Sequence, residues 1–207
     1  MLDFNISHRD SGTAARTGEL ITPHGTVRTP AFMPVGTAGT VKGMAAWELE
    51  RLAPEMVLAN TYHLLLRPGV DRVEGMGGLH TLMAWPGPIL TDSGGYQVFS
   101  LAARRELDDD GVTFRSHLDG SAHRLTPENV VDTQARYGVD IAMVLDECLP
   151  YPVELSGAEV SVARSVAWAR RSLGFAERLR SSEDGWRGGL FAIQQGSLDE
   201  GLRRRCT

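Results

Sequence analysis

Cysteine is scarce in this chain, which has only Cys148 and Cys206 among 207 residues. Two isolated cysteines make neither a disulfide framework nor a metal-ligand cluster, and such usage is typical of a reducing compartment. No apolar run approaches the roughly 20 residues that a membrane span needs. The first ten residues lack the basic segment and apolar core of a secretory signal. We therefore expect a soluble, cytoplasmic protein that has no membrane partner.

Positive charge is also in deficit. The chain has 21 lysines and arginines against 26 aspartates and glutamates, for a formal net charge of −5. A protein that binds nucleic acid with its whole surface is normally basic, so any RNA contact here would use a local patch. The 42% hydrophobic and 23% charged residues are those of an ordinary globular protein,.

Strand and helix signals alternate along the chain. A hairpin is expected within 18–29, followed by five short apolar strands at 31–35, 55–60, 88–92, 141–145 and 189–193. Helices are expected at 45–52, within 68–83, from 127 onward and within 156–180. Such strands between helices indicate parallel strands buried on both faces, as in a (β/α) barrel or an open doubly wound sheet. The turn at 35–40 lacks the glycine spacing of a dinucleotide-binding fold, which weakens the second alternative.

Three local features refine this outline. Alternation around Asp119–Gly120 predicts an inserted hairpin over 112–125. Thr126 is the expected N-cap of the next helix, with Pro127 at its first position. Ser197 is the expected N-cap of a last helix, which stops after about two and a half turns. We therefore expect the chain to be part of a longer protein.

The long helix within 156–180 is expected to have two faces. One is an apolar stripe of Val160, Ala163, Ala167 and Phe175. The other is basic, and a solvated face is favoured there over an RNA-contact face. Its members are Arg164, Arg170, Arg171, Arg178 and Arg180.

The segment 89–100 is the most informative feature of the chain. A short buried strand would deliver Asp92 to its C-terminal tip, and Gly94 and Gly95 would let the backbone turn and approach a flat or anionic ligand. Tyr96 could then lie across a planar ring. The alternative is an ordinary strand-to-helix turn with an aspartate cap.

Polar residues also end three other predicted strands. Asn60 follows one strand, Asp146 another, and the Gln194–Gln195 pair a third. This edge holds the active site in barrels and in open sheets. Two carboxylates and a carboxamide suit recognition of a nitrogen heterocycle, although two carboxylates could also be the acid and base of a glycosidase.

Other candidate chemistry is weaker. The histidines His63, His80, His117 and His123 have no ligand spacing, which argues against a metal site. Cys148 could be a nucleophile only if a histidine approached it. The run 108–110 of three aspartates is interpreted as a solvated loop.

Four segments resemble those of bacterial tRNA-guanine transglycosylases, also called queuine tRNA-ribosyltransferases. They are Asn60–Leu64 (NTYHL), Thr91–Phe99 (TDSGGYQVF), Leu145–Pro152 (LDECLPYP) and Ile193–Ser197 (IQQGS). The resemblance implies a TIM (β/α)8 barrel and an enzyme that replaces guanine at the anticodon wobble position with preQ1. It also implies a double displacement, in which an enzyme aspartate attacks C1′ of the ribose.

The resemblance implies roles for the residues of these segments. Asp92 would be the general acid/base, and Asp146 would accept hydrogen bonds from the ring N–H and exocyclic amine of the base. Gln195 would donate to the ring carbonyl, and Tyr96 would stack on the base. The turn of Ser93, Gly94 and Gly95 would close around the base, and Cys148 marks the preQ1-accepting pocket of bacterial enzymes.

The resemblance also places parts of the family's machinery beyond Thr207. These are the nucleophilic aspartate, a basic anticodon-binding segment and a cysteine-rich zinc site, so no zinc ligand is expected within this chain. We expect residues 1–207 to form one partial barrel domain of about five βα units, inactive alone. The expected partners are the tRNA anticodon loop, guanine or preQ1, and a second subunit in a homodimer. The alternatives are a carboxylate-pair barrel glycosidase and a non-catalytic transglycosylase subunit.

Overall fold

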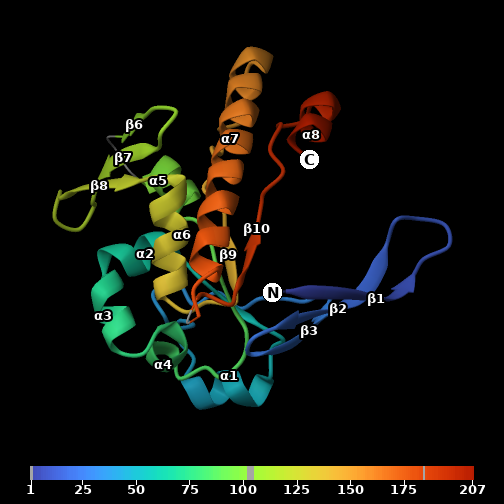
Figure 1. Ribbon diagram of the computed structural model, residues 1–207, viewed down its shortest axis with the longest axis vertical. Helices are drawn as coiled ribbons and strands as arrows, with labels where there is room; N and C mark the ends of the chain where they lie inside the picture. The colour runs from blue at the N-terminus through green and yellow to red at the C-terminus, as the bar shows by residue number, and fades with distance from the viewer. Residues whose placement is uncertain (1, 102–104, 184) are drawn as a thin grey trace. The chain divides into compact units, whose positions relative to one another are not determined.

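The computed structural model describes residues 2–101, 105–183 and 185–207 (Figure 1). By its internal contacts the chain forms two compact units. Unit 1 comprises residues 1–91, 134–142 and 186–189, and unit 2 comprises residues 92–133, 143–185 and 190–207.

Unit 1 begins with a three-stranded antiparallel ribbon. Its strands are β1 (Asp3–Arg9), β2 (Arg16–Thr22) and β3 (Gly25–Thr29), in the order β1-β2-β3. Leu20 pairs with Val27 across β2 and β3, and both side chains are buried. The hairpin expected within 18–29 is confirmed, whereas β1 had no clear signal because its side chains are exposed throughout.

The parallel sheet expected from the apolar strands is present. It consists of β4 (Val57–Ala59), β5 (Ile89–Thr91), β9 (Ile141–Met143) and β10 (Gly189–Phe191), in the order β10-β9-β5-β4. Strand β5 pairs in parallel with both β4 and β9, and all three of its side chains are buried. The strand expected at 31–35 is reduced to one parallel bridge, between Val35 and Leu58. The fold class is therefore α/β with a parallel sheet.

Four short helices belong to unit 1. They are α1 (Ala46–Leu52), α2 (Thr61–Leu66), α3 (Val70–Gly75) and α4 (Leu79–Met83). Helix α1 matches the expected 45–52 helix, and its start is fixed by Glu48, whose Oε2 accepts the Ala45 N–H at 2.8 Å. Helices α3 and α4 share the region expected within 68–83. Helix α2, with Asn60 at its N-cap, was not predicted.

Unit 2 contains the predicted insertion. Strands β6 (Arg105–Leu107), β7 (Val112–Arg115) and β8 (Ala122–Leu125) form an antiparallel sheet after helix α5 (Gly95–Leu101). Helix α6 (Pro127–Arg136) then starts as predicted and ends in unit 1. Its reciprocal cap joins Thr126 and Asn129: the Asn129 N–H donates to Thr126 Oγ1 at 3.2 Å, and the Thr126 N–H donates to Asn129 Oδ1 at 2.8 Å.

The last two helices correct two predictions. In α7 (Leu155–Arg180), Val160, Ala163 and Ala167 are exposed, so the expected apolar stripe is wrong. The buried residues of α7 are Ala158, Ser161, Val162, Ser165, Trp168, Ser172 and Ala176. Helix α8 (Glu200–Cys206) has Asp199 as its N-cap rather than Ser197.

None of the helices in the described ranges combines the length and the apolar character that crossing a membrane requires.

Candidate active site

The segment that follows β5 forms two nested turns. Asp92 Oδ1 accepts the Gly94 N–H at 3.2 Å, and Ser93 Oγ accepts the Gly95 N–H at 3.2 Å. Gly94 has φ of +80°, a conformation that L side chains rarely adopt,. Helix α5 starts at Gly95, and its Gln97 Nε2 donates to Asp92 Oδ2 at 3.0 Å. The two turns and the first turn of α5 therefore fix the Asp92 carboxylate.

Asp146 lies three residues beyond the end of β9 and is only 5% exposed. Gln195 Nε2 donates to its Oδ2 at 2.5 Å, and Ser93 Oγ lies 3.5 Å from its Oδ1. Burial raises the pKa of Asp146, the hydrogen bonds from Gln195 and Ser93 oppose this, and the nearby charge of Asp92 adds to it. The net shift is upward, because these few donors do not replace the water that the carboxylate lost.

Gly95 determines how closely the two loops approach. A Cβ atom built there would lie 3.0 Å from the Asp146 carbonyl oxygen and 3.2 Å from Ser93 Oγ. That spacing is tighter than an ordinary van der Waals contact between carbon and oxygen. The segment after β5 and the segment after β9 therefore meet directly within unit 2.

Of the other residues expected at the strand ends, two lie beside this turn or near Asp146, and two lie elsewhere. Tyr96, in the first turn of α5, is 64% exposed, so its ring is accessible to a planar ligand. Cys148 is partly buried, and its pKa is raised by burial and by the charge of Asp146, so it remains a thiol at neutral pH. Gln194 turns away from the site, because its Nε2 donates to the Arg203 carbonyl of α8 at 2.9 Å. Asn60 belongs to unit 1.

Two of the residues that hold Glu147 were not singled out from the sequence, and the third, Arg164, was expected on a solvated face. Glu147 follows Asp146 directly and is bound by Ser161, Arg164 and Ser165 of α7. The available signal was a set of serines on one helical face, at 161, 165 and 172, in a helix whose predicted apolar stripe was elsewhere. Buried serines at such spacing indicate a polar contact face.

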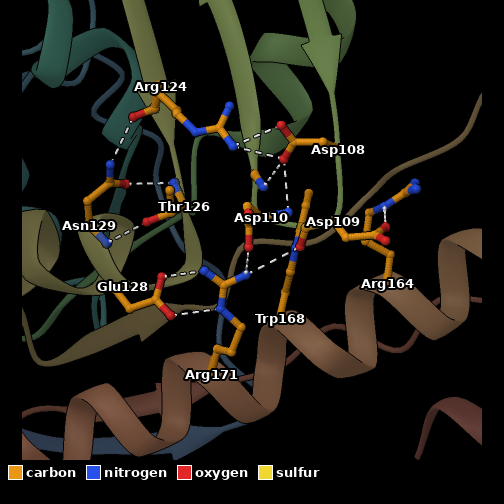
Figure 2. Close-up of polar contacts among 11 residues, drawn as sticks. Asp108, Asp109, Asp110, Arg124, Thr126, Glu128, Asn129, Arg164, Trp168 and Arg171 are labelled. Atoms are coloured by element: carbon orange, nitrogen blue, oxygen red, sulfur yellow. Dashed lines mark hydrogen bonds and ion pairs between the residues drawn. The ribbon is translucent and has the colours of Figure 1, made fainter.

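Two further residues of α7 bind the aspartate-rich loop between β6 and β7, as Figure 2 shows. Trp168 Nε1 donates to the Asp109 carbonyl at 2.7 Å. Arg171 contacts the same carbonyl at 3.3 Å and makes a bidentate pair with Glu128, with both distances 2.8 Å. The 108–110 loop is exposed as expected, but it is also held in place. The solvated basic face expected for α7 is therefore wrong for Arg171, which is partly buried in these contacts, and for Arg164, whose side chain is only 16% exposed.

A second carboxylate cluster lies in unit 1 and was missed because its members are far apart in sequence. His24 Nδ1 lies 2.9 Å from Asp140 Oδ1, and His80 Nε2 lies 3.2 Å from Oδ2. The two imidazole rings stack with centroids 3.7 Å apart. These three side chains offer ligand atoms within 4.8 Å of one another. However, the backbone N–H groups of His24 and Ile89 also donate to the two carboxylate oxygens, at 3.0 and 2.9 Å, so hydrogen bonding accounts for the arrangement.

Comparison with known proteins relates this sequence to a family. The family model described as queuine tRNA-ribosyltransferase matches residues 10–207. The chain is 53% identical over 204 residues to a queuine tRNA-ribosyltransferase of Desulforudis audaxviator, an alignment that covers 99% of this chain and 53% of the relative. It is 51% identical over 193 residues to the enzyme of that name from Thermus thermophilus, with 93% of this chain and 48% of the relative covered.

The chain therefore spans about half the length of the curated relatives that it matches. The matched region includes the strand ends that bear Asp92, Asp146 and Gln195. The resemblance drawn from four short segments thus extends over nearly the whole sequence, and the chain belongs to the queuine tRNA-ribosyltransferase family.

Proposed function

We propose that this chain carries the base-recognition part of a tRNA-guanine transglycosylase, which exchanges guanine at the anticodon wobble position for preQ1. The observation that supports the proposal most is the grouping of Asp146, Gln195 and Ser93 within unit 2, with Asp92 on the adjoining turn. A buried carboxylate next to a carboxamide matches the edge of a guanine-like base, which presents N–H donors beside a carbonyl.

Base recognition would replace the Gln195–Asp146 hydrogen bond. The ring N–H and exocyclic amine of the base donate to Asp146, and the Gln195 amide then donates to the ring carbonyl. The cost of losing the original bond is offset because each group gains a partner from the ligand. Tyr96 stacks on the base, the turn of Ser93, Gly94 and Gly95 encloses it, and Cys148 lies in the preQ1-accepting part of the pocket.

The chemistry proceeds as a double displacement at C1′ of the ribose. The family's nucleophilic aspartate, which lies outside this chain, forms a bond to C1′ as the N-glycosidic bond breaks, and the leaving guanine takes a proton from Asp92. Asp92 then removes the corresponding proton from the incoming base, which attacks C1′ and releases the nucleophile. Two inversions give retained configuration. The target base must first be flipped out of its stack to reach the pocket.

The architecture that we propose for the whole protein is a TIM barrel in which residues 1–207 form one partial domain. The parallel strands β4, β5, β9 and β10 lie in the sheet in the same order as in the chain. The bridge at Val35 adds a further segment beside β4. An order that follows the sequence without reversal supports a barrel, because a doubly wound sheet reverses at a switch point. The protein would act in the cytoplasm as a homodimer that binds the tRNA anticodon loop.

The zinc of this family is proposed to bind outside this chain. A cysteine-rich site needs several thiolates, and Cys148 and Cys206 make no cluster with other metal-binding side chains among the described residues,. Among the described residues, one group of side chains could hold a metal ion, and it consists of His24, His80 and Asp140. Its two histidines contact the Asp140 carboxylate directly. No step of the mechanism above passes through the metal.

The test is transfer of labelled guanine into a tRNA that normally receives queuosine. Residues 1–207 are compared with the product of the complete reading frame. Exchange by the longer protein alone is expected. Guanine binding without exchange by the longer protein would instead identify a non-catalytic subunit, and exchange by residues 1–207 would place the nucleophile within them.

A further inference from the structure

Glu147, the residue after Asp146, is held at three points by helix α7. Its N–H donates to Ser165 Oγ at 3.0 Å, and its carbonyl accepts from Ser161 Oγ at 2.8 Å. Its Oε2 accepts from Arg164 Nη1 at 2.6 Å. Only 7% of the Glu147 side chain and 16% of the Arg164 side chain are exposed. All of these residues belong to unit 2.

The three contacts come from one face of α7. Ser161, Arg164 and Ser165 are related by steps of three and four residues, which places them next to each other on a helix. The same face continues to Trp168, and Figure 2 shows Arg164 and Trp168 directed at the loop that contains Asp109. Arg164 Nε lies 3.2 Å from Asp109 Oδ1, so its guanidinium joins that loop to Glu147.

The position of Glu147 determines the position of Asp146, because they share a peptide group. The N–H of that group is bound to Ser165, and its carbonyl oxygen is the atom that a Cβ on Gly95 would approach to 3.0 Å. The group is therefore fixed by α7 on its N–H side, and its carbonyl side faces Gly95, which leaves room for it only because it has no Cβ atom. A displacement of Glu147 moves the backbone that carries the Asp146 carboxylate.

Arg164 is what makes the buried position of Glu147 tolerable. A carboxylate removed from water stays ionised only when it is paired and hydrogen-bonded, and deletion of one partner leaves the other charge uncompensated. Without Arg164 the Glu147 side chain would lose its ion pair with α7, and only the backbone hydrogen bonds to Ser161 and Ser165 would hold the residue. Asp146 would then lose the alignment that base recognition needs.

We propose that Arg164 is a positioning residue for base recognition, which acts by pairing with Glu147 and so fixing the backbone of Asp146. This inference rests on the proposed function, because it assigns Arg164 a part in the binding of the same base. Arg164 itself contacts neither base nor ribose in this scheme. Its substitution should therefore weaken base binding while leaving the chemical step unchanged.

The test uses Arg164→Gln in the product of the complete reading frame. We expect the KM for guanine to rise about tenfold, since small misplacements of binding groups have effects of this order or larger. The kcat should stay within about twofold of the unsubstituted enzyme, the pattern of lost ground-state binding. Arg164→Lys, which keeps the charge but loses the planar fork, should give an intermediate KM.

The decisive variant is the double substitution of Arg164→Gln with Glu147→Gln. This variant removes the uncompensated charge, so its KM for guanine should return most of the way to that of the unsubstituted protein. Arg170→Gln is the matched control, because Arg170 lies on the exposed side of the same helix. Three results would overturn the proposal. They are an unchanged KM in Arg164→Gln, a fall in its kcat as large as the change in its KM, and a KM in the double variant that stays as high as in Arg164→Gln.

Amide hydrogen exchange at Glu147 separates this proposal from the proposed function. Its N–H is bound to Ser165, so it should exchange faster in Arg164→Gln than in the unsubstituted or Arg170→Gln protein,. If the unsubstituted protein bound no guanine, the proposed function would fail. Unchanged exchange at Glu147 would show instead that Arg164 does not hold this segment.

Discussion

Among the residues that the structure describes, one aspartate is buried in each unit, and the two have opposite environments. Asp140 in unit 1 is fully buried and accepts two backbone N–H bonds in addition to its contacts with His24 and His80. Asp146 in unit 2 is 5% exposed, with one short bond from Gln195 and a long contact from Ser93.

Their pKa values follow the donors rather than the burial. Burial alone would raise the pKa of Asp140, but the hydrogen bonds from His80, Ile89 and His24 outweigh it, and the pKa falls below 3.8. Burial also raises the pKa of Asp146, and there the hydrogen bonds are too few to reverse it. A buried carboxylate with all its donors is a structural anchor, whereas one short of donors is ready to accept those of a ligand.

The largest expected effect is on activity. Asp146→Asn should lower kcat/KM for guanine exchange by about 100-fold or more, because the new amide presents N–H groups to the N–H edge of the base. The same variant should not lower the free energy of unfolding, because it removes a poorly solvated charge. Exchange kinetics and urea unfolding of the complete protein check both parts. Retained exchange would show that Asp146 does not read the base.

The reverse is expected for the anchor in unit 1. Asp140→Asn should lower the free energy of unfolding by about 3 kcal/mol, because buried N–H donors would face an amide nitrogen instead of an oxygen. Asp71→Asn is the control, since the Asp71 side chain is 92% exposed in its pair with Arg136 and should have no measurable effect,. Equal unfolding midpoints for both variants would contradict the assignment of Asp140 as an anchor.

The smallest effect is the pH dependence that distinguishes the two carboxylates. Because the pKa of Asp140 is lowered in the folded protein, its stabilising contribution is present above 3.8 and is lost as the pH falls through the folded value,. Because the pKa of Asp146 is raised, its burial cost is absent in acid and grows as the pH rises through the folded value,.

Unfolding free energies measured from about pH 3 to pH 7 test this sign difference. The deficit of Asp140→Asn relative to the unsubstituted protein should shrink toward the acid end. The advantage of Asp146→Asn should appear only toward the neutral end. Parallel curves for all three proteins would show that neither pKa is shifted on folding.

Local signals predicted the elements whose residues satisfy one another within a few positions. The cap of α6 is such a case, because Thr126, Pro127 and Asn129 form it by themselves. The apolar strand β5 and the polar residue at its end were also predictable, since burial on both faces and a tip position leave a simple pattern. These features led to Asp92, Asp146 and Gln195.

The failures have two physical causes, which are a local backbone conformation and contact with distant parts of the chain. Ser197 was expected to cap α8, but it has φ of +50°, while an N-cap needs an extended backbone,. Asp199 satisfies that need and accepts the Leu202 N–H at 2.7 Å. The polar face of α7 was missed because serines bury favourably only when a partner such as the Glu147 backbone is present.

The close approach at Gly95 has a consequence for variation in this protein. A Cβ atom there would lie 3.0 Å from the Asp146 carbonyl oxygen, so any other residue requires one of the two segments to shift, even though glycine has no side chain to offer a ligand. A saturation library selected for base exchange should therefore favour glycine at position 95. Intolerance at such a site reports the gap between two segments of backbone, and it should not be mistaken for chemical participation.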